Sequence, residues 1–174
     1  MKIYVTGSTR GLGRAIKKQF NKVNSGEVIG LDRPEYNLES LDAYVKDDFD
    51  IYISNAEHLY SQTDLLYALF EANKDRDCHI INIGSVSSDG DRKEVNQYAV
   101  YKTALEKACT QLTLQNKRCK VSLIKPGRMQ TDMVKHIDAP KLDTREVARA
   151  VLWVAAQPMH VNVKSLSIDV MEIK

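Results

Sequence analysis

The stretch from Ile3 to Gly13 constrains the fold of this chain more than any other. It joins a short apolar run to three glycines, Gly7, Gly11 and Gly13, and an amphipathic stretch follows at once. This order predicts a strand, a tight turn and a helix, because glycine allows a sharp backbone turn. The free N–H groups and positive dipole end of such a helix suit a pyrophosphate. The spacing G-x-x-x-G-x-G matches the usual dinucleotide fingerprint, G-x-G-x-x-G, only inexactly.

A second apolar run completes a strand–helix–strand unit. Leu12, Ile16 and Phe20 recur at helical spacing, and the run from Val28 then ends at Asp32. A carboxylate at the end of such a strand can accept hydrogen bonds from an adenosine ribose and repel a 2′-phosphate. The alternative is a turn aspartate that precedes a proline. With the glycine turn in place, we favour the ribose-binding interpretation.

The rest of the chain alternates between apolar runs and helical periodicity. We expect strands over 51–53, 79–83, 121–124 and 166–170, and helices over 39–46, 64–71, 97–115 and 144–156, with Thr63 and Thr144 as caps. The alternation predicts an α/β fold, a Rossmann-type doubly wound parallel sheet of about six strands. Residues 1–174 are expected to form a single dinucleotide-binding catalytic domain. Ligands of such sheets bind at the carboxyl ends of the strands.

Composition excludes several classes of protein. The net charge is +2, from 25 basic and 23 acidic residues without a basic run, so nucleic acid is not an expected partner. The apolar runs are too short to span a bilayer, and the first residues are typical of a core strand rather than a signal peptide. We therefore expect a soluble, cytoplasmic protein without a membrane partner.

Cysteine and histidine do not suggest a metal site. Cys78, Cys109 and Cys119 are odd in number and lack C-x-x-C spacing, which favours neither a disulfide framework nor zinc. The four histidines share no ligand spacing. We expect His79, at the start of a buried strand, to be a hydrogen-bonded core residue.

One group of residues could take part in proton transfer. Tyr98 and Lys102 lie four residues apart in a predicted helix and so share one face, and Ser85 follows a strand. A nearby ammonium favours the phenolate and should lower the pKa of the tyrosine, which is otherwise near 10. With a serine holding the substrate oxygen, these groups can exchange a proton with an alcohol or carbonyl while a nicotinamide moves the hydride. The alternative is a surface pair, which is what Y-x-x-x-K in a helix usually is.

Taken in order along the chain, these features resemble the short-chain dehydrogenase/reductase family, as an unusually short member. The resemblance rests on Thr6, Gly7, Ser8, Thr9, Arg10, Gly11, Leu12, Gly13, Asp32, Asn55, Ala56, Ser85, Tyr98, Lys102, Pro126, Gly127 and Thr131. It implies that Tyr98 is the general acid/base, that Lys102 lowers its pKa and holds the nicotinamide ribose, and that Ser85 orients the substrate carbonyl.

The resemblance also implies a binding track for the dinucleotide. The residues from Gly7 to Gly13 and Asp32 with Arg33 would contact the phosphates and the adenosine ribose, and Asn37 and Leu38 the adenine. The remaining contacts would come from Asn55, Ala56, Tyr98, Lys102, Pro126, Gly127 and Thr131. Asp32 favours NAD(H), whereas Arg10 and Arg33 stand where members that prefer a 2′-phosphate often carry basic residues. We lean slightly to NAD(H), with dual use.

The sequence departs from the family pattern at several positions. Ser54 and Glu57 replace the first asparagine and the glycine of N-N-A-G, and the third-strand region is reduced. The helix before Ser85 is predicted to be short, and Asn73 is the one nearby candidate for the family's catalytic asparagine. We place Asn73 at a helix C-terminus instead, which leaves the proton relay without a clear equivalent. The substrate-covering segment 133–142 is brief, so we expect an open pocket.

The leading hypothesis is an NAD(P)-dependent oxidoreductase that acts on a small-molecule alcohol or carbonyl. The alternative is an NAD(P)-binding regulatory or weakly catalytic protein that has lost the proton relay. An epimerase-type use of the same tyrosine and lysine on a nucleotide sugar is a third option, although the chain leaves little room for a sugar-binding lobe. By resemblance we expect a homo-oligomer, a dimer or a tetramer.

Overall fold

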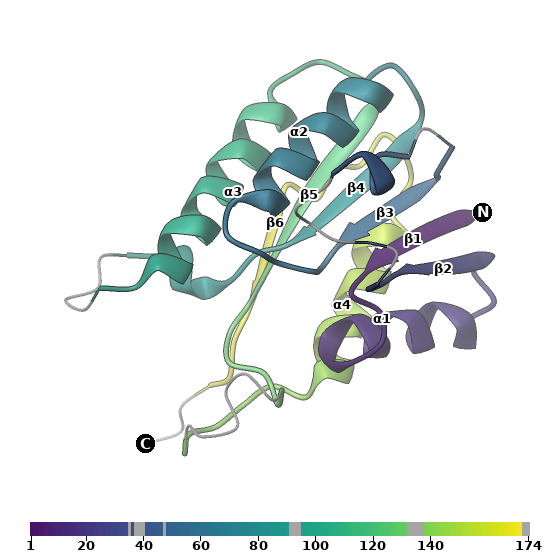
Figure 1. The fold of residues 1–174 in the computed structure, drawn as a ribbon. Coiled ribbons are helices and arrows are strands. Elements are labelled where there is room, and N and C mark those ends of the chain that lie inside the picture. Colours follow the sequence, from purple (N-terminus) through teal and green to yellow (C-terminus); the bar gives the residue numbers. More distant parts are fainter. Residues whose placement is uncertain (35, 37–40, 47, 91–94, 132–137, 172–174) are drawn as a thin grey trace.

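The structure is a computed structural model that describes residues 1–34, 36, 41–46, 48–90, 95–131 and 138–171. Within these residues one parallel sheet has six strands, in the order β2-β1-β3-β4-β5-β6 (Figure 1). The strands are β1 (Lys2–Thr6), β2 (Glu27–Leu31), β3 (Ile51–Ser54), β4 (Cys78–Ile83), β5 (Cys119–Pro126) and β6 (Ser165–Ile168). The predicted Rossmann-type doubly wound sheet is therefore confirmed.

Helices cover both faces of the sheet. They are α1 (Gly11–Lys22), α2 (Ser61–Asn73), α3 (Gln97–Thr113) and α4 (Thr144–Ala155), with the short 3-10 helices η1 (Leu41–Ala43) and η2 (Val86–Ser88). Figure 1 shows α2 and α3 on one face and α1 and α4 on the other. Two cores result: Leu65 and Leu105 pack on the first face, and Ile16 and Val147 on the second. Burial of each such side chain contributes roughly 2 kcal/mol.

The strand order reverses at β1, which pairs with β2 on one side and with β3 on the other. Ligands of open parallel sheets bind at the carboxyl edge beside such a reversal. β2 is the last strand on its side among the described residues, and those between β2 and β3 contain no strand and only the η1 turn. The third-strand region is thus reduced, as predicted.

The helix before Ser85 is longer than the sequence pattern suggests. It starts at Ser61, with Tyr60 as the N-cap residue, so Thr63 lies inside the first turn and is not the cap. The pattern missed this turn because Gln62, although polar, is 2% exposed and faces the sheet. Helix α2 has 13 residues instead of the eight predicted over 64–71, so the prediction of a short helix was wrong.

Further boundaries differ from prediction: α3 ends at Thr113 rather than at residue 115, and β6 covers Ser165–Ile168 rather than 166–170. Asp143, and not Thr144, caps α4, because its carboxylate accepts the Arg145 N–H and Glu146 closes a capping box. Strand β5 is also longer than 121–124 and is buried along its whole length. Its lysines concealed the run, since a lysine inside a strand reads as exposed in a sequence.

Candidate active site at the carboxyl edge of the sheet

The glycine turn between β1 and α1 has the form that the sequence predicts. Gly7 and Gly11 have positive φ values of 66° and 50°, a region that residues with a Cβ rarely adopt. A Cβ at Gly13 would overlap the Gly7 carbonyl oxygen. Arg10 is the N-cap residue of α1 and makes no capping hydrogen bond through its side chain, and the first turn holds no acidic residue. A pyrophosphate fits this turn, because the helix N-terminus is positive and has no carboxylate of its own.

The end of β3 is joined to the same turn. The backbone N–H groups of Asn55 and Ala56 donate to the Thr6 hydroxyl oxygen at 2.9 and 2.8 Å. The Asn55 side-chain amide donates to the carbonyl oxygens of Thr6, at 3.0 Å, and Gly7, at 3.4 Å. Thr131 also comes close, since its Cγ2 is 3.7 Å from where a Gly11 Cβ would stand. The structure thus brings together the glycine turn, Asn55, Ala56 and Thr131.

Asp32 ends β2 as predicted, but its carboxylate is bound within the chain. Oδ1 accepts the Ser8 backbone N–H at 2.5 Å, and Oδ2 accepts the Ser8 hydroxyl at 2.6 Å. Arg10 and Arg33 are both exposed. Asn37 and Leu38, the expected adenine contacts, lie outside the described residues. Asp32 therefore braces the glycine turn, a role that the sequence pattern did not indicate.

Tyr98 and Lys102 share one face of α3, as their spacing predicts. The Lys102 Nζ lies 5.5 Å from the centroid of the Tyr98 ring. Ser85 also reaches Tyr98 through a side-chain hydrogen bond that lowers the pKa of the phenol. Burial and, next in size, the charge of Glu57 raise that pKa further than the bond lowers it. The pKa of Tyr98 is thus raised, opposite to the direction that we expected from a neighbouring ammonium.

Lys102 is buried, and three oxygen atoms surround its ammonium. They are Gln62 Oε1 at 2.8 Å, the Ile83 carbonyl oxygen at 3.0 Å and Glu57 Oε2 at 2.8 Å. Burial lowers the pKa of Lys102, and the Glu57 carboxylate opposes that effect. The sequence pattern marks Glu57 as a departure from a motif but does not predict its pairing with Lys102. It also misses Gln62, because nothing local identifies a glutamine as the partner of a lysine 40 residues later.

Asn73 is the last residue of α2, as expected, and has a structural role there. Its amide donates to the carbonyl oxygens of Lys46 at 2.8 Å and Leu69 at 2.9 Å. Its side-chain oxygen accepts from Arg76 at 2.6 Å. Because both ends of this amide have partners far from Lys102, Asn73 is no equivalent of a catalytic asparagine.

The segment after Ser85 is fixed by an ionic network. Ser85 Oγ accepts hydrogen bonds from Ser87, from its N–H at 3.1 Å and its hydroxyl at 2.8 Å. The Ser88 hydroxyl contacts Glu106 Oε2 at 2.5 Å, and Glu106 Oε1 in turn lies 2.9 Å from the buried Lys125 ammonium. Helix α3 and strand β5 therefore both hold the segment that carries Ser85.

Pro126 and Gly127 end β5 at the same edge of the sheet. The Gly127 N–H donates to the Ile168 carbonyl oxygen at 2.7 Å. A Cβ at Gly127 would overlap the carboxylate of Asp169. This close approach explains the need for glycine after the proline. Both residues lie at the carboxyl edge because β5 ends at Pro126.

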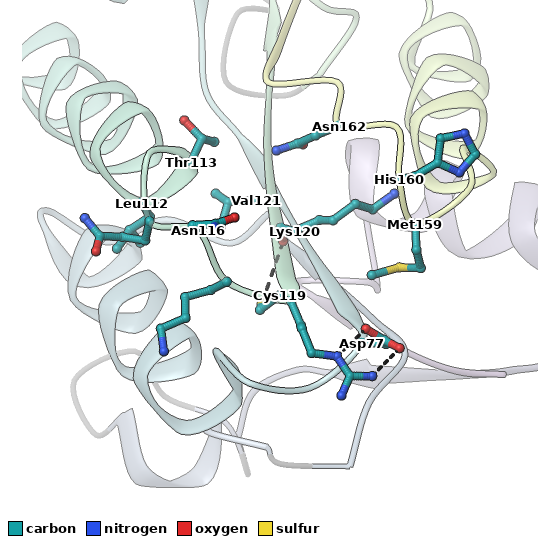
Figure 2. Close-up of a pocket in the computed structure, with 13 residues that line it drawn as sticks. Asp77, Leu112, Thr113, Asn116, Cys119, Lys120, Val121, Met159, His160 and Asn162 are labelled. Carbon is teal, nitrogen blue, oxygen red and sulfur yellow. Dashed lines mark hydrogen bonds and ion pairs between the residues drawn. The ribbon is translucent and has the colours of Figure 1, made fainter.

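The pocket in Figure 2 lies at the opposite end of the sheet. It has a volume of about 500 Å³ and is lined by residues at the starts of β4 and β5, among them Asp77 and Cys119. Asp77 pairs with Arg118. The Lys120 ammonium donates to three carbonyl oxygens, those of Gln157, Pro158 and Val161, at 3.1 to 3.2 Å. With these charges already paired, and with the glycine turn at the other edge, this pocket is not the candidate active site.

His79 is 3% exposed in the centre of the sheet. Its Nε2 lies 2.7 Å from Ser122 Oγ, whereas its Nδ1 has no hydrogen-bond partner among the residues that the structure describes. The expectation of a hydrogen-bonded core imidazole thus holds for one ring nitrogen only. Burial, and then the charge of Lys120, lower the pKa of His79 to about 3.

The described part of the chain holds neither a metal-binding cluster nor a membrane-spanning helix. There, no group of three or more His, Cys, Asp or Glu side chains could hold a metal ion. Within the same residues, every helix is too short or too polar to cross a membrane. Cys78, Cys109 and Cys119 are buried free thiols, and burial raises the pKa of Cys109 to about 12.

Comparisons with known proteins agree with this geometry. The sequence is 32% identical over 152 residues to an uncharacterized oxidoreductase of Staphylococcus epidermidis, a match that covers 84% of this chain. The chain spans 62% of the length of that relative. No family model matches the sequence.

Solved structures show the same fold. A short-chain dehydrogenase/reductase family protein superposes with a TM-score of 0.79 at 19% identity, over 97% of this chain and 95% of that one. A short-chain dehydrogenase from Burkholderia cenocepacia in complex with NADP has a TM-score of 0.76 at 18% identity, over 95% of this chain and 86% of that one. The resemblance predicted from the sequence is confirmed: the fold is that of the short-chain dehydrogenase/reductases.

Proposed function

We propose that this chain is an NAD(P)-dependent oxidoreductase that interconverts an alcohol and a carbonyl, with Tyr98 as general acid/base. The observation that carries the proposal is the meeting of three side chains at the carboxyl edge of the sheet, the edge that also carries the glycine turn. Tyr98 and Lys102 share a helix face, and Ser85 is hydrogen-bonded to Tyr98. The description of the Staphylococcus relative as an oxidoreductase and the NADP in the Burkholderia structure support it.

In this proposal a bound nicotinamide dinucleotide supplies or accepts the hydride. Ser85 donates a hydrogen bond to the substrate oxygen and holds it beside the phenol. Tyr98 gives its proton to that oxygen during reduction and takes it back during oxidation. Lys102 orients the nicotinamide ribose and adds positive charge beside Tyr98. The glycine turn holds the pyrophosphate at the N-terminus of α1.

Both forms of the dinucleotide remain candidates. Asp32 favours NAD(H) because a carboxylate near a 2′-phosphate is costly, but the Ser8 N–H and hydroxyl donate to both oxygens of this carboxylate. Arg10 and Arg33 are exposed and could pair with a 2′-phosphate. The comparisons name NADP and do not support the lean. Titration of the protein with NADH and NADPH, followed by nicotinamide fluorescence, ranks the two.

A second candidate function is nucleotide binding with little or no catalysis. The raised pKa of Tyr98 and the pairing of Lys102 with Glu57 favour it, since both disfavour the phenolate. Asn73 offers no proton relay. This candidate predicts dinucleotide binding by calorimetry without turnover of any alcohol or carbonyl.

The test is Tyr98→Phe, with Tyr101→Phe as the matched control. Tyr101 lies on the same helix, and its ring contacts Tyr60, with 4.6 Å between the centroids. A panel of alcohols and carbonyls is screened first, by absorbance of the reduced nicotinamide. Tyr98→Phe should then lower the rate by about 10² to 10⁴, while the protein still binds the dinucleotide. Full activity in Tyr98→Phe would refute the assignment.

We further propose that residues 1–174 act as one catalytic domain on a small-molecule substrate, within a homo-oligomer. The sheet, whose order runs without interruption from β2 to β6, supports the first point. Resemblance to the family is the ground for the second. Sedimentation velocity gives the oligomeric state, and a pure monomer would contradict it.

A further inference from the structure

All three protons of the Lys102 ammonium are engaged within the chain. An ammonium has three N–H donors, and three acceptors lie within 3.0 Å of Nζ: Gln62 Oε1, the Ile83 carbonyl oxygen and Glu57 Oε2. A ribose hydroxyl that accepts a hydrogen bond from Lys102 must therefore replace one of them. The identity of the acceptor that leaves decides how strongly this chain holds a nucleotide.

Two of the acceptors are fixed. The Ile83 carbonyl belongs to the buried end of β4. Gln62 is held by its own amide, which donates to the Ser54 carbonyl oxygen at 2.7 Å and to that of Ile83 at 3.2 Å. Moving Gln62 would take these donated hydrogen bonds away from buried oxygens, and the loss of the one to the Ser54 carbonyl oxygen costs about 1–3 kcal/mol.

Glu57 differs from both. Its side chain is 21% exposed, whereas that of Lys102 is 4% exposed. It lies between the end of β3 and the start of α2, outside any helix or strand. Its carboxylate can turn toward water, where its oxygens find new hydrogen-bond donors, so it is the acceptor that can leave.

We propose that Glu57 is an exchangeable partner of Lys102: its carboxylate holds the ammonium, and the ribose on the nicotinamide side of a dinucleotide replaces it. The inference rests on the proposed function, since it requires that such a ribose reach Lys102. The exchange breaks a charge-assisted hydrogen bond. Glu57 thereby weakens binding of every ligand that carries this ribose and leaves ligands without it unaffected.

The experiment compares two ligands by calorimetry. ADP-ribose carries the ribose in question, and ADP lacks it; the 2′-phosphorylated pair is used if NADPH binds better than NADH. The variants are Glu57→Ala and Glu57→Gln. Asp75→Asn is the control, because it removes one negative charge from an exposed ion pair with Lys117, between Nζ and Oδ1 at 2.8 Å, at the far edge of the sheet. Urea unfolding verifies that each variant is folded.

The expected result is a Kd for ADP-ribose that falls about tenfold in Glu57→Ala and less in Glu57→Gln, with the Kd for ADP unchanged. Unchanged or weaker binding of ADP-ribose would overturn the exchange. If Glu57→Ala and Asp75→Asn both lowered the Kd of ADP-ribose and of ADP equally, the effect would come from net charge alone. That result would also overturn the exchange. If the natural chain binds neither dinucleotide nor ADP-ribose, the proposed function itself fails. Failure of the exchange alone leaves dinucleotide binding intact.

Discussion

The Lys102 ammonium lies 5.5 Å from the centroid of the Tyr98 ring, yet the pKa of the Tyr98 phenol is raised above its ordinary value. Burial is the largest cause and the Glu57 carboxylate the second. The same carboxylate pairs with Lys102. A lysine one helical turn away is thus insufficient to lower the pKa of the tyrosine when burial and, second, an acidic side chain both raise it.

Glu57→Gln should move the pH profile of alcohol oxidation toward lower pH. Oxidation needs Tyr98 as the phenolate, so its rate rises as the pH passes through the pKa of Tyr98. Removing the Glu57 charge lowers that pKa, because one of its raising causes disappears. The measurement is kcat against pH at saturating dinucleotide. A profile that coincides with that of the natural chain would contradict the electrostatic role of Glu57.

Gln62→Leu should lower the free energy of unfolding by about 2–4 kcal/mol. The substitution removes donors from two buried carbonyl oxygens and an acceptor from Lys102. Gln111→Leu is the control: Gln111 is an exposed residue of α3, and its side-chain oxygen accepts a hydrogen bond from the Tyr67 hydroxyl. Urea titration measures both. Equal losses in the two variants would show that the polar contacts of Gln62 carry no special weight.

Gly13→Ala should open the glycine turn. The added methyl would overlap the Gly7 carbonyl oxygen and stand 2.8 Å from the Asn55 amide nitrogen, so backbone has to move. We expect a loss of more than about tenfold in dinucleotide affinity, together with lower stability. Gly90→Ala serves for comparison, because no atom lies within 4 Å of its Cβ position and its positive φ alone costs about 1–2 kcal/mol. Undisturbed nucleotide binding in Gly13→Ala would argue against this turn as the pyrophosphate site.

Acid should destabilise the protein through His79. Its pKa is about 3 in the folded chain, against roughly 6.5 when unfolded. Between these values the unfolded chain binds a proton that the folded chain does not, so the free energy of unfolding falls as the pH falls. From pH 7 to pH 5 this loss amounts to about 2 kcal/mol.

The variant that isolates this effect is His79→Gln, which cannot take up a proton. Urea unfolding at several pH values should give a shallower acid dependence for the variant, whatever its stability at pH 7. Parallel curves for the two proteins would show that His79 is not the group responsible.

Local spacing predicted much of this fold and site. The glycine turn, the strand–helix–strand unit and the shared face of Tyr98 and Lys102 all follow from residues within a few turns of one another. The hydrogen-bond partners of Lys102 could not be predicted from local spacing, because Gln62 reaches Lys102 only through the packing of α2 against α3. The start of α2 was missed for the same reason: a glutamine buried by a tertiary contact looks like a loop residue in the sequence.

The electrostatic interactions of the site could not be predicted from the sequence either. Glu57 was recognised as a departure from a motif, but its effect on Tyr98 depends on burial that the sequence does not display. Asp32 was correctly placed at the end of β2, whereas its attachment to Ser8 requires the turn and the strand to lie side by side.

That attachment has a consequence for any anion that approaches the turn. The Ser8 N–H is one of the amides that a glycine turn offers to a phosphate, and here it is aimed at the chain's own carboxylate. The Asp32 carboxylate therefore occupies a hydrogen-bond donor of the turn that a phosphate oxygen could otherwise use. A nucleotide entering it meets a site that is already partly neutralised, and must either share this amide with Asp32 or rely on the N–H groups farther into α1.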